Sequence, residues 1–260
     1  MLLQHKNAVI YGAGGAIGGA VARAFAREGA RVFLAGRTMG PIDAVAREIS
    51  VAGGVAETAY VDALDEQAVE QHIGTVAEKT EGIDVSFNAI GFREVQGTPL
   101  VDLSLEDFTF PIMTWTRTLF LTARAAARRM VKRRSGVILT LSAPPGLATP
   151  LVGGFEAACA AIQGLSRTLA GELGPHGIRV VCLQPDAIPE SAALQETFAQ
   201  HAKATRMTRE AFQALQEGGT LLRRLPTLAE VANVAAFMAS DRASAMTGTV
   251  VNLTCGSIVD

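Results

Sequence analysis

The rest of the chain is arranged around one stretch, Ala8-Val9-Ile10-Tyr11-Gly12-Ala13-Gly14-Gly15-Ala16-Ile17-Gly18-Gly19. The apolar run that ends at Tyr11 is typical of a buried strand, and residues 20–28 have the spacing of a helix. Gly12 permits a tight turn between them, and the small residues after it let a diphosphate approach the backbone. Free N–H groups and the positive end of the helix dipole then face its charge. The pattern predicts a nucleotide site with contacts from Gly12, Gly14, Gly15, Ile17 and Gly18.

A second apolar strand follows at residues 31–35, after Gly29 and Ala30 stop the helix. A glycine-rich turn alone is weak support for a nucleotide site, because a flexible loop has the same composition. The strand, turn, helix and second strand together make a βαβ unit of the length that dinucleotide-binding folds use. This context favours the nucleotide site over the flexible loop.

The end of the second strand predicts which dinucleotide is bound. In βαβ nucleotide folds this point lies beside the adenosine ribose, where a carboxylate binds the 2′-hydroxyl. Here Gly36 occupies the position of the acid, and Arg37 follows it. A guanidinium matches a 2′-phosphate in charge and geometry. The sequence therefore favours NADP(H) over NAD(H), the alternative being that Arg37 is an ordinary solvated side chain.

Strands and helices alternate along the rest of the chain. We expect strands at 55–61, 83–87, 137–141, 178–183 and 248–253, and helices at 41–52, 65–80, 104–133, 155–173, 190–217 and 227–239. Pro111 is expected to break or start a helix, so that 104–133 holds one or two. This alternation predicts a single α/β domain over residues 1–260, a Rossmann-type doubly wound parallel sheet flanked by helices. The polar helical region within about 187–220 is interpreted as a mobile substrate flap.

Composition bounds the class of protein. Hydrophobic residues make up 49% of the chain and charged residues 18%, which suits a sizeable core, and a net charge of −2 gives no field for nucleic acid or an acidic membrane. Cys159, Cys182 and Cys255 lie far apart in apolar segments, which indicates buried thiols rather than disulfides or a metal site. No apolar run is long enough to span a bilayer, and the first strand begins too close to Met1 for a signal peptide. We expect a cytoplasmic protein that binds no metal, nucleic acid or membrane.

Several motifs resemble those of the short-chain dehydrogenase/reductase family over nearly the whole chain. The glycine turn is similar to the family's Thr-Gly-x-x-x-Gly-x-Gly, with Tyr11 replacing the threonine and Ala16 the middle glycine. Further similar segments are Asn88-Ala89-Ile90-Gly91, Gly164-Leu165-Ser166-Arg167-Thr168-Leu169-Ala170-Gly171-Glu172-Leu173 and Glu230-Val231-Ala232-Asn233. The resemblance implies that Asp62 contacts the adenine and that Asn88, Gly91 and Pro185 belong to the cofactor site. It also implies a homo-oligomer, a dimer or tetramer, paired through the helix at 155–173 and the helix before it. The alternative is that the small residues of the helix at 155–173 pack on the sheet.

The catalytic residues depart from the family pattern. Family members usually reduce a carbonyl or oxidise an alcohol with Ser, Tyr and Lys, plus an Asn one helix earlier. Ser142 stands at the serine position, but residues 155–161 align so that Phe155 replaces the tyrosine and Cys159 the lysine. The asparagine position falls near Trp115. A phenylalanine cannot donate a proton and a thiol cannot supply the charge of lysine, so tyrosine-based carbonyl reduction is unsupported.

Other departures cluster in the same region of the predicted fold. Asp186 stands where the family has glycine after Pro185, and Pro189-Glu190-Ser191 replaces a threonine segment that holds the nicotinamide carboxamide. Pro144-Pro145-Gly146 is expected to stiffen the loop after Ser142.

Three functions fit these features. The first is an NADP(H)-dependent reductase of an activated C=C or C=N bond, with its proton from water, Ser142, Glu190, His201 or Lys203; for each flap residue, solvated surface is the alternative interpretation. The second is a nucleotide-binding protein without turnover, a sensor or partner subunit. The third is a non-redox elimination or isomerisation in the same pocket. The substrate is a small molecule, and Phe198, Met207, Phe212 and Leu215 either favour an apolar one or form the packing face of the flap.

Overall fold

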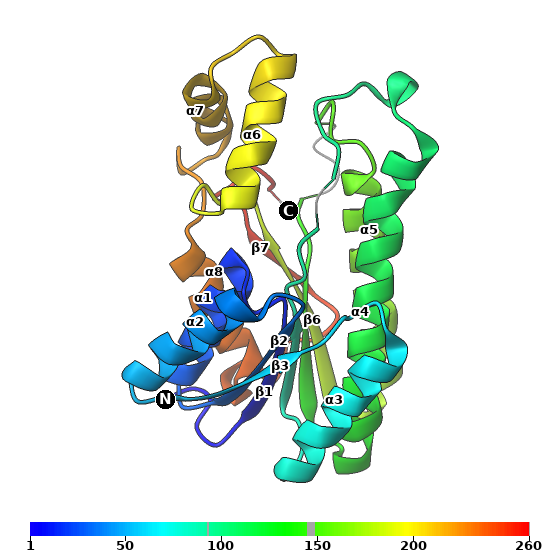
Figure 1. Cartoon of the computed structure of the whole chain (residues 1–260), viewed down its shortest axis with the longest axis vertical. Coiled ribbons are helices and arrows are strands. Elements are labelled where there is room, and N and C mark those ends of the chain that lie inside the picture. The colour runs from blue at the N-terminus through cyan, green and yellow to red at the C-terminus, as the bar shows by residue number, and fades with distance from the viewer. Residues whose placement is uncertain (93, 145–148, 260) are drawn as a thin grey trace.

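The computed structural model describes residues 1–92, 94–144 and 149–259, so Pro145 and Gly146 of the expected stiff loop lie outside the described residues. Seven parallel strands within this part form one sheet in the order β3-β2-β1-β4-β5-β6-β7 (Figure 1). The strands are β1 (Asn7–Tyr11), β2 (Arg31–Gly36), β3 (Val55–Tyr60), β4 (Val85–Asn88), β5 (Gly136–Leu141), β6 (Ile178–Pro185) and β7 (Val250–Leu253). The strand order reverses between β1 and β4, as in a doubly wound fold. The predicted fold class is confirmed.

Helices cover both faces of the sheet (Figure 1). One layer holds α1 (Ala16–Arg27), α2 (Met39–Val51) and α8 (Leu228–Ala239), and the other holds α3 (Glu66–Lys79), α4 (Leu105–Arg133) and α5 (Phe155–Leu173). Each layer closes its own apolar core against the sheet, which is why the central strands are apolar on both faces. Two further helices, α6 (Ala192–Ala204) and α7 (Arg209–Gly219), stand beyond the carboxyl ends of the strands.

Of the one or two helices expected over 104–133, the structure has one, α4, which is continuous through Pro111. The expectation that Pro111 breaks or starts a helix is wrong. The Ser104 hydroxyl accepts a hydrogen bond from the Asp107 N–H and caps the new N-terminus. Pro111 costs the second turn one backbone hydrogen bond, about 3 kcal/mol. The following turns bury Trp115 and Leu119 against the sheet, which offsets that cost.

The single helical region expected at 190–217 is two helices. Helix α6 ends at Ala204, and Arg206 then takes a left-handed conformation with φ of 58°. Thr208 caps the next helix by accepting from the Ala211 N–H at 3.1 Å. The signal for this break in the sequence is Thr208, a residue type that often caps helices. It is hard to recognise because the whole segment is polar.

Candidate functional site

The glycine turn between β1 and α1 is closely packed. Gly12 has a φ of +75°, and a Cβ there would lie 2.5 Å from the Ala89 carbonyl oxygen. A Cβ on Gly18 would lie 2.3 Å from the Gly12 carbonyl oxygen, so the first turn of α1 rests directly on the turn. Gly15 precedes this helix without a side-chain cap, and the first turn carries no acid. No side-chain cap thus occupies the N–H groups at this helix start, and such a start is suited to an anion.

The other predicted cofactor residues lie at the carboxyl ends of the neighbouring strands. Arg37 is exposed just beyond β2 and makes no hydrogen bond or ion pair within the described part of the chain. Asp62 is half-buried beyond β3, and its Oδ1 accepts from the Leu64 N–H at 3.0 Å. Gly91 is exposed. These positions lie along one edge of the sheet, where a dinucleotide is bound in doubly wound folds.

Asn88 differs from these exposed or half-buried residues because its side chain is buried and hydrogen-bonded within the protein. It is 4% exposed, and its amide donates to Thr122 Oγ1 at 2.9 Å. Its Oδ1 accepts from the Ile90 N–H at 3.1 Å. Asn88 thus fastens the end of β4 to α4 and shapes the segment that follows β4.

A cavity of about 430 Å³ opens beside the glycine turn. Two of the predicted cofactor residues, Ile17 and Pro185, line it together with the predicted catalytic Ser142. Asp186 also lines it, and its carboxylate accepts from the Ala187 N–H and the Ser257 hydroxyl. The volume is that of a small-molecule site. The structure therefore brings one end of the predicted cofactor site and the predicted catalytic region to the same cavity.

Aromatic side chains form one wall of this cavity. Phe155, the first residue of α5, stacks on Trp115 of α4 with ring centroids 5.5 Å apart. Phe92 packs edge-on against Trp115, with ring centroids 5.4 Å apart. All three rings line the cavity, and no tyrosine or lysine does so among the described lining residues. The wall offers apolar surface to a ligand and no phenol.

Ser142 lines the cavity, and Cys159 is buried next to it. The Ser142 hydroxyl has the carbonyl oxygens of Ala143 and Cys159 as acceptors, at 3.0 and 3.2 Å, and is 2% exposed. The Cys159 side chain is 1% exposed, and burial raises the pKa of its thiol to about 12. The thiol is therefore uncharged at neutral pH, so position 159 places no positive charge beside the cavity.

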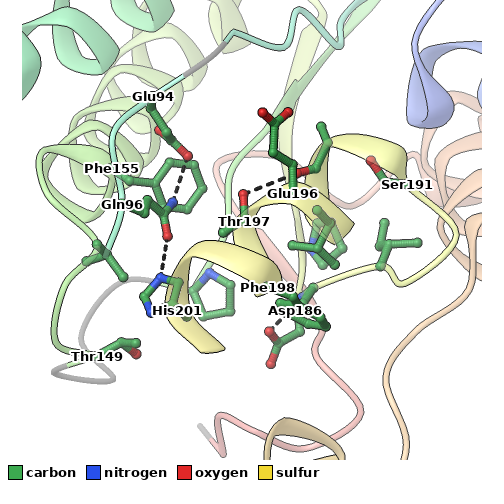
Figure 2. A pocket seen from close by; sticks show the side chains of 18 of the residues that line it. Glu94, Gln96, Thr149, Phe155, Asp186, Ser191, Glu196, Thr197, Phe198 and His201 are labelled. Atoms are coloured by element: carbon green, nitrogen blue, oxygen red, sulfur yellow. Dashed lines mark hydrogen bonds between the residues drawn. The ribbon is translucent and has the colours of Figure 1, made fainter. Parts of the chain in front are cut away.

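A chain of three hydrogen-bonded polar side chains lines the cavity (Figure 2). Gln96 Nε2 donates to Glu94 Oε1 at 2.8 Å, and His201 Nε2 lies 2.7 Å from Gln96 Oε1. Burial raises the pKa of Glu94 to about 7 and lowers the pKa of His201. With His201 neutral, its Nε2–H is the donor to Gln96. Sequence reasoning missed Glu94 and Gln96, because they lie in an irregular segment after β4 and meet His201 only through the fold.

The flap forms the wall opposite the aromatic rings. Of the three flap residues considered as proton sources, only His201 lines the cavity. The Glu190 carboxylate instead accepts from the Leu228 N–H at the start of α8, and Lys203 is exposed. The ring centroids of Phe198 and Phe212 lie 5.4 Å apart, and both residues line the cavity. The pair therefore packs within the flap and also offers apolar surface to the cavity.

The flap is also joined to the segment after β4. The Gln96 N–H donates to the Gln200 side chain at 3.2 Å, beside the contact of Gln96 with His201. Within the described residues no cluster of His, Cys, Asp or Glu could hold a metal ion. None of the helices described there combines the length and apolar character that crossing a bilayer requires.

Comparison with known proteins places the chain. The family model described as enoyl-(acyl carrier protein) reductase matches residues 12–257. The chain belongs to the short-chain dehydrogenase/reductase family. The uncharacterized oxidoreductase YxbG of Bacillus subtilis is 31% identical over 247 residues, which are 95% of this chain and 88% of YxbG. The 3-oxoacyl-[acyl-carrier-protein] reductase FabG of Chlamydia trachomatis is 30% identical over 260 residues, 98% of each chain.

A solved structure shares the fold of this short-chain dehydrogenase/reductase. NAD⁺-bound xylitol dehydrogenase superposes with a TM-score of 0.91 at 24% identity, covering 96% of this chain and 98% of that one. At this identity the likeness concerns the fold alone. The relatives above extend the assignment to a family of oxidoreductases, which confirms the resemblance seen in the sequence.

Proposed function

We propose that this protein is an NADP(H)-dependent reductase that transfers hydride to a small apolar substrate without a tyrosine acid. The observation that carries the proposal is the aromatic wall. Phe155 stacks on Trp115 beside a cavity that adjoins the glycine turn through Ile17. Phe155 thus presents apolar surface at the position where the family pattern has a tyrosine. The anion site predicted at the glycine turn lies next to it.

The residues present fit a phosphorylated dinucleotide. The cradle at Gly12 and Gly18 has no room for a Cβ, and the start of α1 has N–H groups free for a diphosphate. Arg37 is exposed and has no protein partner among the described residues, as a ligand for a 2′-phosphate should be. When bound, the reduced cofactor supplies a hydride. The NAD⁺ of xylitol dehydrogenase shows that this fold also accepts the unphosphorylated form.

The chain's own residues then exclude water and orient the substrate. The aromatic wall and the flap enclose the cavity on opposite sides, and both offer apolar surface. The family description names an enoyl reductase, and a relative reduces a 3-oxoacyl group. An activated double bond, which places less demand on a phenolic acid than an ordinary carbonyl, suits a cavity without tyrosine.

A protein that binds the dinucleotide without turnover is the second candidate. It is favoured by Ser142, whose hydroxyl is directed to the main-chain carbonyls of Ala143 and Cys159. In this case Ser142 is structural, and the chain acts as a sensor or as a partner subunit.

Two measurements test the proposal. Calorimetric titration should show NADPH binding more tightly than NADH, and Arg37→Ala should weaken NADPH by about tenfold while leaving NADH unchanged, as for one lost charge-assisted contact. Incubation with NADPH and a panel of ketones, imines and enones then tests turnover, with Ser142→Ala as a second variant. Absence of dinucleotide binding refutes both candidates, whereas binding without turnover on any substrate leaves the second.

We also propose that two copies pair through α4 and α5. Phe110, Met113 and Phe120 of α4 are large apolar side chains that are 46%, 63% and 44% exposed, which is unusual for a helix of a monomer. Light scattering coupled to gel filtration tests the pairing. A cytoplasmic location is proposed from the three free thiols, since oxidising compartments favour disulfides.

A further inference from the structure

Glu94 is a carboxylic acid that lines the cavity, and one of its oxygens has no hydrogen-bond partner among the described residues. Its Oε1 accepts from Gln96, and its Oε2 is buried without a hydrogen-bond partner in the described part of the chain. It lines the same cavity as the aromatic wall of Phe92, Trp115 and Phe155. A buried carboxyl oxygen without a partner is costly, so its persistence points to a ligand that satisfies it.

On the basis of the reductase function above, we propose that the substrate is an apolar imine and that Glu94 protonates its nitrogen and then pairs with the resulting iminium ion. Oε2, which is buried beside the cavity, is the oxygen that must reach the nitrogen. Gln96 and His201 are positioning residues, because they hold Oε1 and so fix the direction in which Oε2 points.

The basicity of the atom to be protonated favours an imine substrate over a ketone substrate. Imine nitrogens are basic near neutral pH, whereas carbonyl oxygens are basic only in strong acid. An acid is most effective when its pKa lies near the working pH, and burial has raised the pKa of Glu94 to about 7. Glu94 therefore matches an imine nitrogen and is poorly matched to a ketone.

The charges around Glu94 also suit a cation. The Cys159 thiol is neutral, and no lysine or arginine lines the cavity among the described residues. His201 is neutral and faces Glu94 only through Gln96. Three more carboxylates, those of Glu156, Asp186 and Glu196, line the cavity, and each has partners of its own. The aromatic faces of the wall add attraction for a cation.

The proposed step balances. The O–H bond of Glu94 breaks and an N–H bond forms, which leaves a carboxylate beside an iminium ion. Hydride from the reduced dinucleotide then adds to the carbon, and the C=N π pair becomes the lone pair of an amine. The imine is reduced by two electrons, the dinucleotide is oxidised by two, and Glu94 takes its next proton from water. No alkoxide forms, so no phenol is required.

Binding without cofactor provides the first test. The probes are 2-methyl-3,4-dihydroisoquinolinium, a permanent iminium, and 1-tetralone, a neutral ketone of similar shape. Calorimetry, supported by quenching of Trp115, should show the cation binding about tenfold or more tightly than the ketone. Glu94→Gln should abolish this preference, and the matched control Glu190→Gln, whose carboxylate lies outside the cavity, should retain it. Equal binding of the two probes, or an unchanged preference in Glu94→Gln, overturns the proposal.

Turnover with NADPH provides the second test. Glu94→Gln should lower kcat for the protonatable 3,4-dihydroisoquinoline by about a hundredfold, since a general acid contributes at least this much. The permanent iminium needs no proton, so the same variant should keep its kcat and lose only affinity, seen as a raised KM. Equal kcat of wild type and Glu94→Gln on the imine overturns the role of Glu94. A cation preference without any binding of NADPH overturns the proposed function and leaves only a cation site.

Discussion

Replacing Glu94 with glutamine should change how the stability of the protein depends on pH. Burial raises the pKa of Glu94 from 4.5 to about 7 in the folded chain, so the folded state holds this proton more tightly than the unfolded state does. The resulting stabilisation is complete below about pH 4.5 and is lost as the pH rises to about 7. The glutamine side chain has nearly the same shape and does not titrate, so its contribution is constant over this interval.

The size of the effect follows from the displacement of the pKa. At about 1.4 kcal/mol per unit, a rise from 4.5 to about 7 corresponds to about 3 kcal/mol. The free energy of unfolding of Glu94→Gln, relative to wild type, should therefore increase by about this amount between pH 4 and pH 8. Effects of other titrating groups are common to both proteins and cancel in the difference.

Urea unfolding at a series of pH values measures this difference. Trp115 is the only tryptophan of the chain and is 6% exposed, so its fluorescence reports the loss of the aromatic wall. Parallel pH profiles for the two proteins would refute the reasoning, because they would mean that Glu94 titrates alike in the folded and unfolded chains. A fall in the stability of Glu94→Gln relative to wild type between pH 4 and pH 8 would show the opposite sign and would refute it as well.

Three other changes test separate parts of the structure. Gly18→Ala places a Cβ 2.3 Å from the Gly12 carbonyl oxygen, so it should cost about 1–3 kcal/mol and weaken dinucleotide binding, measured by urea unfolding and calorimetry. Gly74→Ala, in the middle of α3 with its nearest neighbour at 3.5 Å, is the matched control and should stabilise by about 1 kcal/mol. Burial raises the pKa of all three thiols, and only Cys255 is not fully buried, so a thiol reagent at about pH 8 should modify Cys255 alone in the folded protein, as peptide mass spectrometry will show. Phe155→Tyr combined with Cys159→Lys should introduce reduction of 1-tetralone in an NADPH assay, and no gain would show that the cavity has diverged beyond these two positions.

Local pattern was enough to predict the sheet. Apolar runs such as the one ending at Tyr11 lie in strands, and the glycine turn after it has the geometry that an anion site needs. The local sequence pattern was misleading where tertiary packing or a helix cap determines where a helix begins or ends. Pro111 continues a helix because later turns are buried, and the polar segment around Thr208 divides because that residue caps a new helix.

The candidate site was predicted in part for a similar reason. Ser142, Phe155 and Pro185 were found because they follow or begin regular elements, and all three line the cavity. Glu94 has no periodic context in the sequence. Its importance comes from its burial and from its link to His201 through Gln96. His201 and Gln96 are 105 residues apart in the chain, so neither the burial nor the link can be predicted from the sequence alone.

Gln96 belongs to two parts of the site at once. Its side chain holds Glu94, while its backbone N–H and side-chain oxygen hold Gln200 and His201 of the flap. Lifting α6 therefore separates the same contacts that keep Glu94 in place, and admits solvent to that carboxyl. In the proposed reaction, one opening of the flap would then release the product and let Glu94 take up its next proton. At high pH, this proton uptake in the open state would limit the rate of turnover.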